Sequence, residues 1–88
     1  MKYTCRCCGY KTLDEPPDGS YEICPVCYWE DDLVQTEDPD FEGGANRPSL
    51  RQAQRNFVDF RASERRLVGY VRKPKPDEPK DSSWSILP

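Results

Sequence analysis

The chain has 88 residues, of which 35% are apolar, 33% are charged and nine are Pro, and its formal net charge is −3. This length allows one domain at most, and no apolar run approaches the ~20 residues of a membrane span. A chain so small and polar buries little apolar surface against the ~1.5 kcal/mol that ordering each residue costs, and such domains usually need disulfides or a metal ion.

Five cysteines are the most informative part of the composition. Only Met1 to Thr4 precede the first of them, so we expect no signal peptide and a cytoplasmic protein. Disulfide frameworks favour secreted chains and even numbers of cysteines, whereas paired cysteines in a cytosolic chain indicate a metal site.

Four of the cysteines form two Cys-x-x-Cys pairs with fifteen residues between them, and the four are Cys5, Cys8, Cys24 and Cys27. A tight turn brings both sulfurs of such a pair to ~2.3 Å from a shared ion, and backbone N–H groups of the turn can point at the thiolates. Two facing turns complete a tetrahedron, so the spacing predicts one bound zinc ion. Iron is the alternative, because four thiolates suit either metal.

The residues beside the pairs refine this prediction. Gly9 follows Cys8 and tolerates the positive φ that such a turn often needs. Tyr28 stands where a second Gly is expected, so either Tyr28 is left-handed or the second turn leads straight into another element. We exclude Cys7 from the ligands and expect a bystander facing solvent or a small pocket, the alternative being a reactive thiol beside Arg6.

The first half predicts a small hairpin or three-stranded sheet that carries both metal-binding turns. Short β-favouring stretches flank the first turn and precede the second, at 3–4, 10–13 and 21–23. We expect Tyr10, Tyr21 and Trp29 to pack near the site. Residues 30–42, with seven carboxylates, are interpreted as a solvated acidic loop; a calcium site there is rejected because Pro39 interrupts the loop and no final carboxylate follows.

A helix is predicted at about 49–62. Ser49 and Gln52 match a capping box, and apolar residues then recur at helical spacing, at Leu50, Ala53, Phe57 and Phe60. This apolar face should pack on the hairpin. Beyond it, four prolines make residues 73–88 a Pro-rich tail that we expect to be extended or partly disordered, although Trp84 and Ile86-Leu87 hint at docking.

The fold class expected is therefore a small metal-stabilised α+β domain of residues 1–72. It combines a zinc-ribbon or rubredoxin-like hairpin carrying two Cys-x-x-Cys turns with one amphipathic helix and the tail of residues 73–88.

Charge is divided unevenly and bears on function. Residues 1–46 hold three basic and eleven acidic side chains, whereas residues 47–88 hold ten basic and five acidic ones. A ribbon that bound nucleic acid should carry Lys and Arg around its cysteines, so nucleic acid is an unlikely partner. The chain has no His, which removes the commonest general base, and four Cys ligands leave zinc no open position, so we expect no enzyme.

Two long stretches resemble the cysteine-rich CPCC family of small, mostly bacterial proteins, and they are Tyr3 to Leu13 and Tyr21 to Asp32. The similarity continues through 43–46, Ser49-Leu50, Ala53, Asn56-Phe57 and 71–74. One departure is Arg6, where the family motif has Pro. The resemblance implies a compact metal-binding domain and no particular activity. The separate turns also look like those of rubredoxins, whose intervening segment is longer and whose second turn ends in Gly.

The function expected is a zinc-binding module in which the metal is structural and the partner is another protein. That partner would meet the acidic segment 30–42 or the Pro-rich tail. A rubredoxin-like iron electron carrier and a nucleic-acid-binding zinc ribbon are the alternatives, and the residues select neither a partner nor a cellular process.

Overall fold

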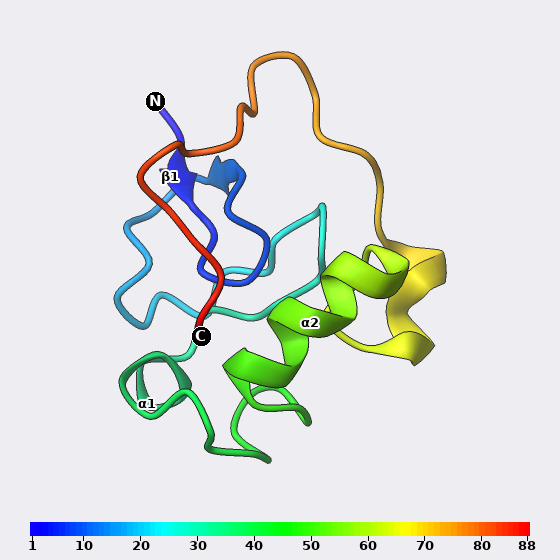
Figure 1. The fold of residues 1–88 in the computed structure, drawn as a ribbon. Coiled ribbons are helices and arrows are strands. Elements are labelled where there is room, and N and C mark those ends of the chain that lie inside the picture. Colours follow the sequence, from blue (N-terminus) through cyan, green and yellow to red (C-terminus); the bar gives the residue numbers. More distant parts are fainter.

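Two short strands and three helices are joined by long irregular segments in the computed structural model, which describes all of residues 1–88. Strands β1 (Tyr3–Thr4) and β2 (Lys11–Leu13) precede helices α1 (Leu33–Glu37) and α2 (Leu50–Phe60) and the 3-10 helix η1 (Arg65–Tyr70). Helix α2 crosses the middle of the molecule, and the C-terminal segment returns past the strands (Figure 1). The expected α+β class is confirmed. None of the helices has the length and apolar character of a membrane span.

Of the two sheets that the sequence allowed, the smaller one forms. Strands β1 and β2 pair antiparallel around the first cysteine pair, and residues 21–23 add no third strand. Only a single bridge joins Ile23 to Glu30. Tyr21 has a φ of 62°, which breaks an extended strand, and its side chain is 61% exposed. The prediction that Tyr21 packs near the site was therefore wrong.

The core is built around the cysteines. Of its eleven buried residues five are Cys, and the others are Leu13, Val26, Trp29, Leu50, Ala53 and Phe57. The last three come from α2, which confirms that the apolar face of this helix packs on the cysteine turns, and Tyr10 packs against the same cluster. Cys7 is only 1% exposed, so it faces the interior, whereas we had also considered solvent.

Helix α2 begins at Leu50, as the cap predicted. The Ser49 hydroxyl accepts a hydrogen bond from the amide of Gln52 at 3.1 Å. The Gln52 side chain donates to Asn56 instead of completing the capping box. The helix ends at Phe60 because Arg61 is left-handed, with a φ of 65°.

Replacing the capping hydroxyl should cost a modest amount of stability. Ser49→Ala is expected to lower the free energy of unfolding by about 1 kcal/mol, because an amide of the first turn loses its acceptor. Urea denaturation of the metal-loaded protein measures the change. Ser49→Thr keeps the hydroxyl and should recover most of the loss; equal effects of the two variants would contradict the cap.

The acidic segment 30–42 is only partly the solvated loop that we expected. Its carboxylates from Glu37 onward are exposed, but the segment contains α1, and Asp31 and Asp32 are buried. Oδ2 of Asp31 accepts hydrogen bonds from the amides of Gly19 and Ser20 at 2.9 and 2.8 Å. Asp32 caps α1 through Oδ1 and accepts from the amide of Ala45 through Oδ2. These two carboxylates are buried because they bind backbone N–H groups of two separate loops.

The side chain of Gln35, which is fully buried, makes several hydrogen bonds to the loop after α1. Its amide nitrogen lies 3.0 to 3.1 Å from the carbonyl oxygens of Phe41, Asn46 and Pro48. Its amide oxygen accepts from the backbone and side-chain nitrogens of Asn46. Gln35 therefore joins α1 to the entrance of α2.

Residues 73–88 lack regular structure, as their prolines require, but they lie against the first cysteine turn rather than extending away. The amide of Asp81 donates to the carbonyl of Gly9 at 2.8 Å, and the Trp84 indole donates to the carbonyl of Arg6 at 2.9 Å. A Cβ atom added at Gly9 would lie 2.4 Å from the Trp84 ring. We expected an extended or partly disordered tail with a hint of docking at Trp84; in the structure, backbone hydrogen bonds and the Trp84 indole hold the segment in place.

Candidate metal centre

The two Cys-x-x-Cys turns have the same backbone structure. In the first turn, the backbone carbonyl of Cys5 accepts a hydrogen bond from the amide of Gly9 at 2.9 Å. The backbone amide of Cys5 donates to the carbonyl of Tyr10, also at 2.9 Å. In the second turn, the backbone carbonyl of Cys24 accepts from the amide of Tyr28 at 2.7 Å, and its backbone amide donates to the carbonyl of Trp29 at 3.0 Å. The turns are thus two copies of one motif.

A left-handed residue closes each copy, Gly9 with a φ of 79° and Tyr28 with a φ of 69°. Of the two alternatives for Tyr28, the uncommon conformation is the one observed. The left-handed conformation costs a tyrosine about 1 kcal/mol. The centre of the Tyr28 ring lies 5.6 Å from that of the Tyr70 ring.

The four cysteines of the two pairs converge in the core. Their sulfur atoms all lie within 4.8 Å of one another, and each of these cysteines is 0% exposed. The sulfurs of Cys5 and Cys27 are 3.6 Å apart, and those of Cys8 and Cys24 are 3.8 Å apart. A tetrahedral ion with ~2.3 Å bonds to sulfur requires sulfur–sulfur distances of ~3.8 Å. The arrangement therefore fits one metal ion, and Cys7 lies outside the set.

Burial makes a cation necessary if these sulfurs are to ionise together. Desolvation raises the pKa of the Cys5 and Cys27 thiols well above its usual range. Hydrogen bonds from the neighbouring sulfurs, that of Cys27 first, lower the pKa of Cys24. Several thiolates this close together would repel one another. A divalent ion at the centre of the four sulfurs would remove this repulsion, because a coordinating thiol is deprotonated outright.

Two further groups support the sulfur of Cys24. The hydroxyl of Thr12 lies 3.0 Å from this atom and donates to it when the sulfur is a thiolate. The amide of Val26 lies at 3.4 Å and points at the same sulfur, as expected for a turn of this kind. Thr12 was missed by the sequence reasoning, because nothing in a three-residue strand marks which side chain faces a metal.

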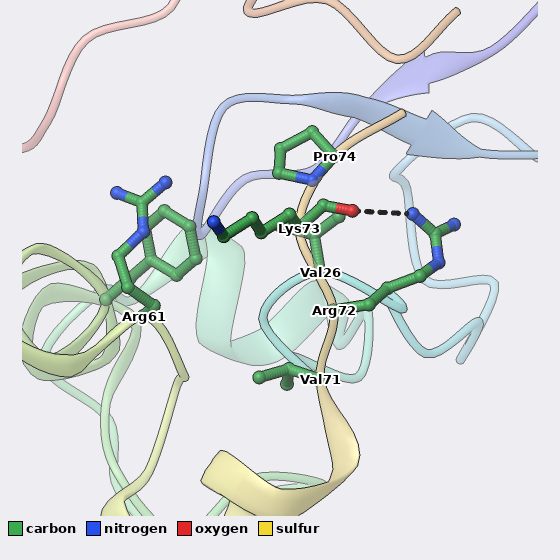
Figure 2. Close-up of a pocket in the computed structure, with 7 residues that line it drawn as sticks. Val26, Arg61, Val71, Arg72, Lys73 and Pro74 are labelled. Carbon is green, nitrogen blue, oxygen red and sulfur yellow. Dashed lines mark hydrogen bonds between the residues drawn. The ribbon is translucent and has the colours of Figure 1, made fainter. Parts of the chain in front are cut away.

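The chain passes the second turn again after η1. The amide of Arg72 donates to the carbonyl of Pro25 at 3.2 Å, which holds residues 71–74 beside the turn. A pocket of about 530 Å³ opens between this segment, Val26 and the end of α2 (Figure 2).

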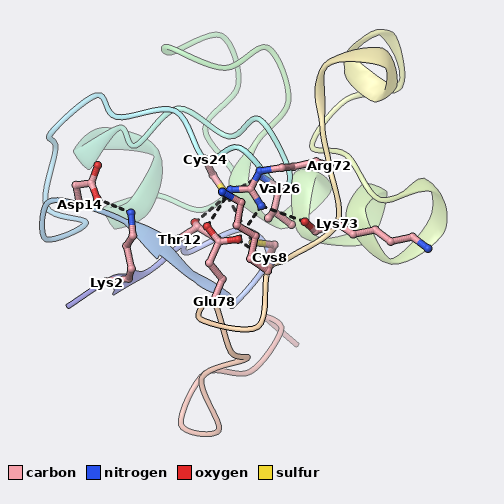
Figure 3. A network of polar contacts seen from close by, with 10 residues as sticks. Lys2, Cys8, Thr12, Asp14, Cys24, Val26, Arg72, Lys73 and Glu78 are labelled. Atoms are coloured by element: carbon pink, nitrogen blue, oxygen red, sulfur yellow. Dashed lines mark hydrogen bonds and ion pairs between the residues drawn. The ribbon is translucent and has the colours of Figure 1, made fainter.

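An ion pair fixes the same segment near the cysteines. The Arg72 guanidinium binds both carboxylate oxygens of Glu78, at 2.7 and 2.9 Å, and Glu78 also accepts from the amide of Lys75. Figure 3 shows this pair next to Cys24 and Thr12. The hydrogen bonds from Arg72 lower the pKa of the Glu78 carboxyl to about 2.

Neutralising Glu78 should destabilise the protein at every pH near neutrality. The folded pKa lies below the ordinary 4.5, so the contribution of this carboxylate is complete above pH 4.5 and is lost as the pH falls toward 2. Because solvent at the half-exposed Arg72 weakens its attraction to Glu78, we expect Glu78→Gln to lower the free energy of unfolding by about 2 kcal/mol. Unfolding in urea at pH 6 and at pH 8 should give the same difference from wild type.

An exposed ion pair provides the matched control. Asp14→Asn removes the partner of Lys2, whose pair lies at the surface, and should change the free energy of unfolding by less than about 0.5 kcal/mol. Equal effects of the two substitutions, or a Glu78→Gln effect that grows between pH 6 and pH 8, would contradict the role assigned to Glu78.

The fold and the centre together define a small cysteine-rich α+β protein with four thiols positioned to hold one metal ion. Comparison with protein families matches the model described as Cysteine-rich CPCC over residues 3–78, and the chain belongs to this family. The match covers both cysteine turns, both main helices and the Arg72–Glu78 pair. A comparison with curated proteins gave no match.

Proposed function

We propose that the protein is a zinc-binding module in which Cys5, Cys8, Cys24 and Cys27 hold one structural ion. The observation that carries the proposal is the convergence of four fully buried sulfurs at distances that suit a tetrahedral ion. Zinc in such a site contributes to folding and activates no water, because all four positions are occupied by sulfur.

Metal analysis tests the proposal directly. Protein purified rapidly from its own cells and examined by native mass spectrometry should carry one zinc ion per chain and should be colourless. Less than half an equivalent of zinc would overturn it. Red protein with ferric-thiolate absorption would instead support the iron electron carrier, since the same four sulfurs suit iron.

The cellular role that we propose is protein interaction. Apolar side chains are exposed beside the second turn, where Tyr28 packs on Tyr70 and lies in one hollow with Ile23. Tyr70 is 67% exposed and Ile23 is 43% exposed. We prefer this surface to the acidic segment 30–42 and the tail because its exposed aromatic and apolar side chains border a hollow. Native mass spectrometry of the same material would detect a bound partner, and a partner whose binding survives Tyr70→Ser with Ile23→Ser would contradict this surface.

A further inference from the structure

The pocket beside the second cysteine turn combines an apolar floor with a charged rim. Val26 and Phe57, both core residues, form its floor, and Val71 and Pro74 form one wall. Arg61, Arg72 and Lys73 supply the charge, and no carboxylate lines the pocket. A volume of about 530 Å³ lies within the range typical of small-molecule sites, which combine apolar walls with a few polar groups.

Two of the three cations are free to bind a ligand. The guanidinium of Arg72 turns away from the pocket, toward the carbonyl of Lys73 (Figure 2) and the carboxylate of Glu78 (Figure 3). Arg61 and Lys73 take part in none of the ion pairs of the chain. The Lys73 side chain extends across the pocket toward Arg61 (Figure 2). An anion in the pocket would meet positive charge that no carboxylate of the lining neutralises.

The position of Arg61 is also fixed by the fold. It ends α2 in the left-handed conformation, where Gly is the usual residue, and its guanidinium lies 4.2 Å from the centre of the Phe57 ring. The ring thus holds the guanidinium over one part of the apolar floor, so that a ligand's charged group would lie beside its apolar body.

We propose that this pocket binds a small organic carboxylate, with its charged group between Arg61 and Lys73 and its apolar body against Val26, Phe57 and Val71. The two oxygens of one carboxylate can each accept hydrogen bonds from one of these two cations. The third terminal oxygen of a phosphate would lack a partner, because Arg72 is bound to Glu78. The proposal goes beyond the metal-binding role and does not depend on which metal the centre holds.

Titration of the isotope-labelled, metal-loaded full chain with 3-phenylpropanoate tests the pocket by NMR. We expect saturable shifts at the amides of Val26, Val71 and Lys73, with a dissociation constant of about 1 mM or below. The neutral 3-phenylpropanamide has the same apolar body and should bind at least about tenfold more weakly, because it lacks the charge.

Variants locate the site. Lys73→Gln changes an exposed side chain in an irregular segment and should weaken binding of 3-phenylpropanoate about tenfold, as should Arg61→Gln. Arg55→Gln removes the same charge from an exposed position of α2 outside the pocket and should leave binding unchanged. The proposal would be overturned if no shifts appear at 10 mM probe (~10 times the expected constant). It would also be overturned if the amide binds as tightly as the carboxylate, or if Arg55→Gln weakens binding as much as the two pocket variants. Zinc content measured on the same samples separates this outcome from failure of the metal centre.

Discussion

Removal of the metal is expected to unfold the chain. Five of the eleven core residues are Cys, so the ion would sit at the centre of the core rather than at its edge. Without the ion, the four thiols lose their shared ligand, and nine other buried apolar residues remain to order 88 residues. Structural zinc contributes ~10–16 kcal/mol in small peptides, which exceeds the usual stability of a domain this size. Addition of a strong chelator should collapse the dispersed amide spectrum, and restoring zinc should recover it.

Cys7 provides the matched control for this experiment. It lies in the same turn as Cys5 and Cys8 and is as deeply buried, but its sulfur is outside the cluster of four. Cys8→Ala should lose the metal and unfold, whereas Cys7→Ala should keep one equivalent and cost about 1–2 kcal/mol for the atom removed. A chelated protein that retains its native spectrum, or a Cys7→Ala protein that loses the metal, would contradict the assignment.

Replacing Gln35 is expected to produce the next largest loss. Its side chain donates to carbonyls of Phe41, Asn46 and Pro48 and accepts two hydrogen bonds from Asn46. Gln35→Ala leaves these buried groups without partners, and each unsatisfied group costs about 1–3 kcal/mol. Since the loop can shift to admit some water, we expect a total of about 3–4 kcal/mol. Urea denaturation of the zinc-loaded protein measures the loss, and faster hydrogen exchange at Asn46 should accompany it.

Two further variants separate hydrogen bonding from packing at this position. Gln35→Glu keeps the size of the side chain but cannot donate to three carbonyls when ionised, so it should be nearly as destabilising as Gln35→Ala. Gln52→Ala truncates an exposed glutamine with one side-chain partner and should change stability by less than about 0.5 kcal/mol. A loss below 1 kcal/mol for Gln35→Ala (~one net hydrogen bond) would show that the loop does not depend on this amide.

The features that could be predicted are those set by local patterns. The spacing of the cysteines identified the four clustered sulfurs, since two residues between Cys5 and Cys8 suffice to form the turn. The cap at Ser49 and the helical repeat gave α2 to within two residues at its C-terminal end, where the left-handed Arg61 stops it.

What could not be predicted depends on contacts between segments far apart in the sequence. Asp31 and Asp32 were predicted to be solvated because acidic residues usually are. Their burial depends on the backbone amides of Gly19, Ser20 and Ala45, which no local sequence pattern places near them. The exposure of Tyr21 follows from its left-handed backbone, for which a tyrosine gives no signal.

The return of the C-terminal segment to Gly9 sets an order of assembly. The sulfurs of Cys5 and Cys27 are 22 residues apart in the chain, whereas the hydrogen bond from the Trp84 indole to the carbonyl of Arg6 joins residues 78 apart. Loop closure becomes less favourable with separation, and residue 84 also leaves the ribosome long after residue 27. During synthesis the two cysteine turns can therefore meet first, and the indole then closes over a first turn that is already formed.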